Sequence, residues 1–188
     1  MYECGGDNPG GMIMDETKIN LEVETQTFRF TPSEPIKHEE AVSIGRGVKS
    51  GEFVVIIHEN PHATLVIEPE GSVLVHGISR SEVARLAVQE LLLSLGMSDE
   101  WLLVESGEMI IRFSIGRAVL MDLAADRFSE INFDSRIGAL RINADRHKCS
   151  ILLFNNGHGI VLKQTSKRIA EMAIRHWSSQ LDDEGDLA

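Results

Sequence analysis

The chain has 188 residues, of which 43% are hydrophobic and 25% are charged, and its formal net charge is −11 at pH 7. This composition is typical of a globular protein that buries a sizeable core. Cys4 and Cys149 are too few for a disulfide framework, and no apolar stretch approaches the roughly 20 residues that cross a bilayer. A cytoplasmic protein without a secretory signal or a membrane partner is therefore expected. The acidic excess argues against non-specific nucleic-acid binding.

The charge is unevenly distributed along the chain. Residues 1–96 hold 15 acidic and 7 basic side chains, whereas residues 97–181 hold 10 acidic and 11 basic ones. Both ends lack the apolar residues that offset the entropy of ordering. Residues 1–16 and the acidic segment 182–188 are therefore predicted to be disordered tails.

The first half begins with an alternating, strand-like run at 19–28, followed by a short helix at 34–43 and a strand at 53–57. A hairpin is expected to turn at residues 68–71, because proline and glycine favour turns. The spacing of Ser79 and Glu82 predicts a capping box at the start of a long helix that ends near Leu95.

The second half has the same order of elements. An alternating run at 108–116 precedes a short helix at 118–128 and a strand at 139–142. A hairpin turning at residues 155–157 is predicted by the sequence Asn-Asn-Gly, which tolerates positive φ. A long amphipathic helix follows and ends near Leu181.

These two halves indicate an internal repeat. Residues 63–95 align without a gap on residues 149–181, with five identical positions and thirteen pairs that are apolar in both copies. The alternative is that any unit of strand, turn, strand and helix aligns this well on periodicity alone. The matching upstream strands favour a true repeat, with halves at 17–96 and 97–181.

Strands precede the long helix in each half and most connections are short, which predicts an α+β fold with antiparallel sheets. Two such units can merge into one continuous sheet. Its helices would lie on one face and leave the other face open.

Parts of this chain resemble the TATA-box-binding protein family, in particular its archaeal-type members. The sequence at 150–181, SILLFNNGHGIVLKQTSKRIAEMAIRHWSSQL, is similar to the end of a family repeat. FSIGR at 113–117 resembles the end of the family's first strand, and 137–142 resembles the segment after its Phe-Pro-Gly. The resemblance implies a saddle of two direct repeats, with helices on the convex face and a concave face that sits on the DNA minor groove.

The resemblance, together with strand alternation, also implies the DNA-facing residues. Ile151, Leu153 and Val161 are expected on the helix side, and Phe154 is the one family wedge that is kept. Helix residues Lys167, Arg168 and Arg175 are expected to contact transcription initiation factors. The candidate DNA-binding residues are Asn20, Val66, Leu74, Arg136, Leu152, Phe154, Ile160 and Leu162.

Four carboxylates depart from the family pattern. Glu22 and Glu24 follow Asn20 on the opening strand, and Glu68 and Glu70 stand where the family has Phe and Ser. They are predicted to form a solvated acidic face on the first half, or alternatively a surface for a basic partner or a mimic of DNA. Binding of DNA is accordingly expected mainly through the second half.

Other family positions are also replaced. Three of the four wedge positions read Glu68, about Lys49 and about Arg136, and Glu108 stands in place of the family's second minor-groove Asn.

No enzymatic or cofactor site is predicted. His58 and His62 are four residues apart but fall in a strand and a turn, where this spacing does not suit a metal. Cys149 lies in an apolar strand and is expected in the core.

The first interpretation is a nucleoid-associated transcription factor that binds the minor groove of A·T-rich promoter DNA and recruits initiation factors. The alternative is a saddle-shaped protein-interaction or regulatory module that has lost DNA binding. A second copy of the chain is a further candidate partner.

Overall fold

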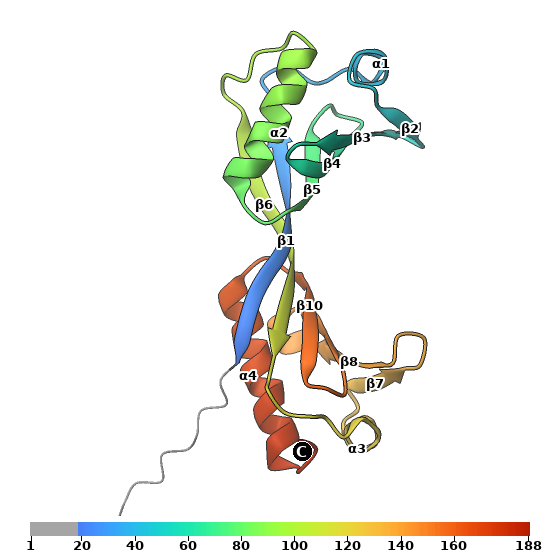
Figure 1. Ribbon diagram of the computed structural model, residues 1–188, viewed down its shortest axis with the longest axis vertical. Helices are drawn as coiled ribbons and strands as arrows, with labels where there is room; N and C mark the ends of the chain where they lie inside the picture. Colours follow the sequence, from blue (N-terminus) through green and yellow to red (C-terminus); the bar gives the residue numbers. More distant parts are fainter. Residues whose placement is uncertain (1–18) are drawn as a thin grey trace, which may run out of the picture.

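The computed structural model describes residues 19–188, and the predicted tail at 1–16 lies outside the described residues (Figure 1). The first half contains β1 (Asn20–Thr31), α1 (His38–Ser43), β2 (Val48–Ser50), β3 (Phe53–Glu59), β4 (His62–Ile67), β5 (Val73–Ile78) and α2 (Ser81–Ser94). The second half contains β6 (Leu103–Ser114), α3 (Met121–Arg127), β7 (Ile131–Asp134), β8 (Ala139–Ala144), the 3-10 turn η1 (Asp145–His147), β9 (Cys149–Leu153), β10 (His158–Gln164) and α4 (Lys167–Asp183).

The strands form one antiparallel sheet in the order β2-β3-β4-β5-β1-β6-β10-β9-β8-β7. The long helices α2 and α4 lie on one side of the sheet, and the outer strands of both halves curve away from them on the other side (Figure 1). The predicted α+β fold of two direct repeats in one curved sheet is confirmed. No helix in residues 19–188 is long and apolar enough to cross a membrane.

An approximate two-fold axis runs between the two central strands, β1 and β6, and relates the two halves. Arg29 on β1 lies opposite Glu105 on β6, and Arg112 on β6 lies opposite Glu22 on β1. Because the two pairings mirror each other, Arg29 and Arg112 occupy equivalent places. The axis passes beside Gln26, at the middle of β1.

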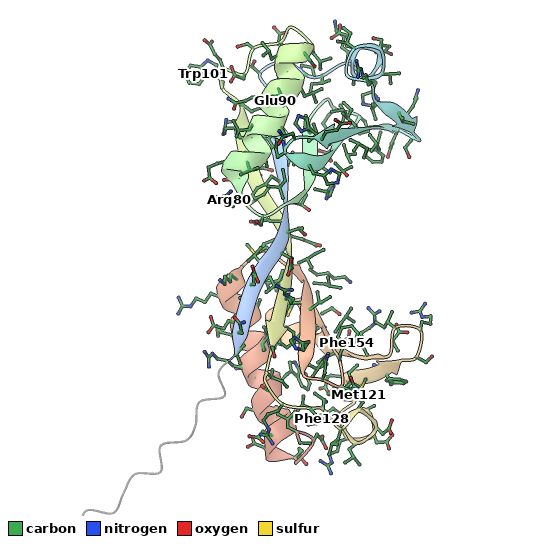
Figure 2. The ribbon with its side chains drawn as sticks, in the orientation of Figure 1. Arg80, Glu90, Trp101, Met121, Phe128 and Phe154 are labelled. Atoms are coloured by element: carbon green, nitrogen blue, oxygen red, sulfur yellow. The ribbon has the colours of Figure 1, made fainter. Side chains whose placement is uncertain are left out.

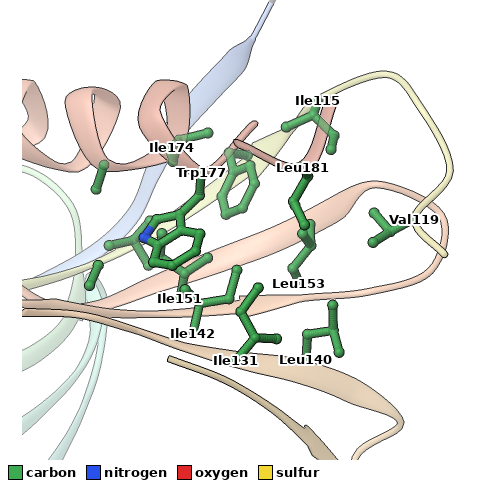
Figure 3. Close-up of a cluster of buried hydrophobic side chains, with 14 of the residues drawn as sticks. Ile115, Val119, Ile131, Leu140, Ile142, Ile151, Leu153, Ile174, Trp177 and Leu181 are labelled. Carbon is green, nitrogen blue, oxygen red and sulfur yellow. The ribbon is translucent and has the colours of Figure 1, made fainter. Parts of the chain in front are cut away.

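Each half has its own hydrophobic core between the sheet and its long helix. Figure 3 shows the core of the second half, where Trp177 of α4 lies over the strands. Ile151, Leu153 and Val161 are each at most 2% exposed, so the prediction that they face the helices is confirmed. The free thiol of Cys149 is also buried, and burial raises its pKa.

The start of α2 differs from the prediction. Its N-cap residue is Arg80, and no side chain caps the helix. In α4 the equivalent residue is Ser166, whose hydroxyl accepts a hydrogen bond from the Ile169 amide at 3.4 Å. The expected capping box at Ser79 and Glu82 is therefore wrong, because the helix begins one residue later than that box requires.

The acidic segment 182–188 is not a disordered tail. Its first two residues continue α4, and Asp186 and Leu187 are buried. The Asp186 carbonyl accepts a hydrogen bond from the Leu120 amide at 2.8 Å, and the Ala188 amide donates to the Ala118 carbonyl at 2.9 Å. One apolar residue and a set of backbone hydrogen bonds thus hold a segment that composition alone predicts to be disordered.

Candidate functional site on the concave face

The open side of the sheet carries two matching rows of side chains. Residues directly opposite each other on neighbouring strands share a face, so the ladder pairings define each row. The first row consists of Val48, Val55, Val66, Leu74, Arg29 and Glu105. The second row consists of Asn132, Arg141, Leu152, Ile160, Arg112 and Glu22.

The rows share one chemical pattern and differ at their outer ends. Half-buried aliphatic pairs, Val66 with Leu74 and Leu152 with Ile160, lie next to the arginine in each row. The outer end of the first row is aliphatic, whereas that of the second row is polar. The concave face therefore offers aliphatic surface beside a cation in both halves.

In the second row, Arg112 is held by two carboxylates. Its Nη2 lies 2.8 Å from Glu22 Oε2 and its Nε lies 2.8 Å from Glu24 Oε1. Hydrogen bonding to Glu22 and the negative charge of Glu24 raise the pKa of Arg112. A hollow of about 250 Å³ opens beside this pair and is lined by Asn20, Glu22, Arg112, Phe113, Ser114 and His158.

In the first row, Arg29 is paired with Glu68. The Arg29 Nη2 lies 2.8 Å from Glu68 Oε1, and the Ser72 hydroxyl donates to Glu68 Oε2 at 2.6 Å. Glu68 is only 7% exposed, so its prediction as a solvated residue is wrong. Glu70 is exposed, and its carboxylate accepts a longer hydrogen bond of 3.2 Å from Ser72.

The outer end of the second row contains a third arginine and carboxylate cluster. Asp134 Oδ2 lies 2.9 Å from Arg136 Nη2 and 3.2 Å from Arg141 Nη2. Hydrogen bonds from Arg136 and then Arg141 hold the pKa of Asp134 well below its usual range. Arg136 itself lies in the turn between β7 and β8, with its side chain 83% exposed.

A hollow of about 460 Å³ lies at the two-fold axis between the rows. Leu162 and Lys163 of β10 line it, as do Thr27 and His76, whose Oγ1 and Nδ1 atoms are 3.3 Å apart. Lys163 has a φ of 60° and its equivalent, Gly77, has a φ of 92°. Both strands are thus locally irregular where they flank the centre of the face.

The structure places most of the predicted DNA-binding residues on this one face. Val66, Leu74, Leu152 and Ile160 are in the rows, while Asn20 and Leu162 line the two hollows.

Phe154 and Glu68 occupy equivalent places at the two hairpin turns. Each donates its backbone amide to a carbonyl across the turn at 2.9 Å, Phe154 to His158 and Glu68 to Ser72. Phe154 lies on the side of the sheet away from α4 (Figure 2). The hairpins were predicted at these turns, and the family wedge position is aromatic in the second half alone.

The predicted acidic face is assigned to the wrong half. Glu22 and Glu24 belong to β1, but this end of β1 pairs with the end of β6 that adjoins β10. They therefore lie over the second half. The strand register also corrects the predicted place of Glu108. Leu103, and not Glu108, has the place on β6 that Asn20 has on β1.

Sequence reasoning missed the row arginines Arg29, Arg112 and Arg141. The signal was present, since each stands between two apolar residues, in Phe-Arg-Phe, Ile-Arg-Phe and Leu-Arg-Ile. In a strand this pattern places the arginine on the face opposite the core.

The predicted partner contacts on α4 are all exposed. Arg175 Nη2 lies 2.9 Å from Glu171 Oε1, whereas Lys167 and Arg168 form no ion pair with any residue in 19–188. His58, which was considered as a metal ligand, instead contacts another side chain of the protein. His58 Nε2 lies 2.9 Å from Glu90 Oε2, and the described residues contain no group of three or more side chains that could hold a metal ion.

Comparisons with known proteins agree with this architecture at the level of the fold. No protein-family model matches the chain, and no curated protein matches its sequence. The solved structure of Methanococcus jannaschii TBP, a TATA-box-binding protein, superposes with a TM-score of 0.76 at 17% identity, covering 87% of this chain and 98% of that one. A heterotetrameric sarcosine oxidase from Corynebacterium sp. U-96 gives a TM-score of only 0.35 at 13% identity, covering 92% of this chain and 88% of that one, and carries no argument about fold. The chain therefore has the saddle fold of TATA-box-binding proteins.

Proposed function

We propose that the concave face binds the minor groove of A·T-rich duplex DNA and that the chain acts in transcription initiation. The observation that carries this proposal is the pair of matching rows, with aliphatic side chains beside an arginine on the open side of a saddle. Aliphatic side chains suit the sugar edges of the minor groove, and arginine suits its negative potential. The halves 17–96 and 97–181 would each cover part of one groove. Phe154 is the proposed wedge, and Asn20 and Arg136 are proposed groove contacts.

The ion pairs of the concave face determine how strongly it is expected to bind DNA. Each row arginine already has a carboxylate partner, so a phosphate must displace that partner before the arginine contributes. An arginine that is already neutralised releases few counterions from DNA. Binding should therefore be modest in strength and should fall only slightly as the salt concentration rises.

A double substitution at Glu22 and Glu24 tests the proposal. Glu22→Gln with Glu24→Gln frees Arg112 for DNA, so affinity for an A·T-rich duplex should rise several-fold and the salt slope should steepen by about 1. Arg112→Ala should lower the affinity. The measurement is fluorescence anisotropy of a labelled duplex over a series of salt concentrations.

The matched control is Glu39→Gln with Glu40→Gln, which makes the same charge change on α1. It should alter DNA affinity much less than the substitutions beside Arg112. The proposal fails if neither the wild type nor the Glu22 and Glu24 variant binds duplex DNA at low salt.

A second candidate function is recognition of a basic protein segment by the same face. It is favoured by the exposed carboxylates of Glu22 and Glu24, which outnumber the one arginine that they hold. The same double substitution distinguishes the two functions, because it should weaken binding of a basic peptide while it strengthens binding of DNA.

A further inference from the structure

The outward face of α2 carries apolar side chains that the core does not use. Ala87 and Leu91 pack inward, whereas Leu86 is 54% exposed and Leu93 is 78% exposed. Glu82 lies one helical turn before Leu86 and is also exposed. This face therefore joins an acidic residue to an aliphatic stripe.

The outward face of α4 also carries an exposed apolar residue, here beside basic residues, although Ser179 stands in the place of Leu93. Ala173 and Trp177 pack inward, whereas Met172 is 52% exposed. Arg168 lies one helical turn before Met172, and Lys167 precedes it; both are exposed.

These two faces are equivalent through the repeat. Leu86 corresponds to Met172 in the alignment of the halves, and Glu82 corresponds to Arg168. Glu82, like Arg168, forms no ion pair within residues 19–188. The molecule thus presents complementary charges at equivalent positions on its two long helices.

We propose that two copies of the chain associate back to back through these helix faces, with α2 of one copy against α4 of the other. Figure 1 shows both helices on the same side of the sheet, with their amino-terminal ends toward the waist where β1 and β6 meet. An antiparallel two-fold arrangement therefore forms both contacts at once and closes the dimer. Each contact joins Glu82 to Arg168 and Leu86 to Met172 of the other copy.

Charge selects this arrangement over the parallel one. With parallel long axes, Glu82 would face Glu82 and Arg168 would face Arg168, and like charges at an interface are repulsive. The apolar pair of each contact adds buried area, and the charges fix the register. The concave faces point outward in the dimer and stay open, so the inference is independent of the proposed DNA binding.

Charge reversal tests the dimer without DNA. Sedimentation velocity of the wild type over a concentration series should show a species of twice the 20.8 kDa chain mass. Glu82→Arg and Arg168→Glu should each raise the dimer dissociation constant by about tenfold or more. The double variant, and also an equimolar mixture of the two single variants, should dimerise within about threefold of the wild type, because both restore opposite charges at each contact.

Two further variants complete the test. Leu86→Asp should abolish the dimer, and Glu52→Arg, the same charge change in the exposed turn between β2 and β3, should leave it intact. Circular dichroism checks that each variant is folded. A wild type that stays monomeric, or a double variant that stays as weak as the single ones, would overturn the inference.

Discussion

The arginines of the concave face illustrate how a single side chain decides what a surface can bind. Arg29, Arg112 and Arg141 project from the sheet opposite its core, and each meets a carboxylate within 3.2 Å. The ion pairs of Arg112 with Glu22 and Glu24 are exposed on both sides and contribute little to folding stability, because solvent screens them. An anionic ligand of this face must compete with the carboxylate for each guanidinium.

His147 in η1 is a buried histidine whose surroundings change its pKa. The residue is 9% exposed, and its Nδ1 has no hydrogen-bond partner in the described part of the chain. Burial, followed by the nearby His176 and Arg146, lowers the pKa of His147. The folded protein therefore favours the neutral ring.

This shift predicts a loss of stability in mild acid. Above the ordinary pKa of 6.5 both the folded and the unfolded chain hold the neutral ring; below it the unfolded chain gains a proton that the folded chain resists, and stability falls. His147→Gln should make the free energy of unfolding less dependent on pH between about pH 7.5 and about pH 5. Urea unfolding at a series of pH values measures this. His62→Gln, at an exposed position on β4, is the control, and an unchanged pH dependence in His147→Gln would contradict the account.

Among the elements, the segment after α4 depends on one arginine. Arg127 of α3 lies 2.7 Å from the carboxylate of Asp186, which is fully buried, and also donates to the Glu184 carbonyl. The second carboxylate oxygen of Asp186 has no hydrogen-bond partner in the described residues. The charge of Asp186 is thus compensated mainly by Arg127.

Arg127→Ala should therefore lower the free energy of unfolding by about 2 kcal/mol, because it leaves a buried carboxylate without its counter-charge. Arg127→Ala combined with Asp186→Ala should be less destabilised than the sum of the single variants. Chemical unfolding of the four proteins measures the cycle. Additive effects would mean that the two residues act independently.

Some elements of the fold could be predicted from the sequence, and others could not. The hairpins, the long helices and the repeat from Ala63 onward depend on local periodicity and turn residues, so they could be predicted. The start of β6 could not, because Leu103, Val104 and Glu105 are all exposed and do not alternate. Without that boundary the register across β1 and β6 is lost, and Glu22 and Glu24 are placed on the wrong half.

For the candidate site, alternation correctly predicts which side of the sheet each residue faces but not which residues meet. Val66 and Leu152 could be assigned to the open side from sequence. The pairing of Glu68 with Arg29 joins a hairpin turn to a strand 39 residues away in the chain, and nothing local encodes it. Burial of Glu68 follows from that pairing rather than from its own hydropathy.

At the scale of the whole molecule, the net charge of −11 does not decide what the protein binds. The concave face pairs its arginines with carboxylates, and Lys167 and Arg168 of α4, which form no ion pair within residues 19–188, lie on the opposite side of the sheet. The approximate two-fold symmetry of the saddle matches that of a DNA duplex, whereas the charges on α2 and α4 break it. A saddle with a nearly neutral concave face should bind DNA through shape and apolar contact more than through phosphate charge.

The most direct test of DNA binding compares three duplexes that differ in their minor groove, which the concave face is proposed to contact. Inosine lacks the amino group that guanine places in the minor groove, so an I·C duplex has the minor groove of A·T and a major groove like that of G·C. At low salt the protein should bind A·T and I·C duplexes within about threefold of each other, and G·C at least about tenfold more weakly. If the I·C duplex binds like the G·C duplex, or if no duplex binds, the proposed function is contradicted.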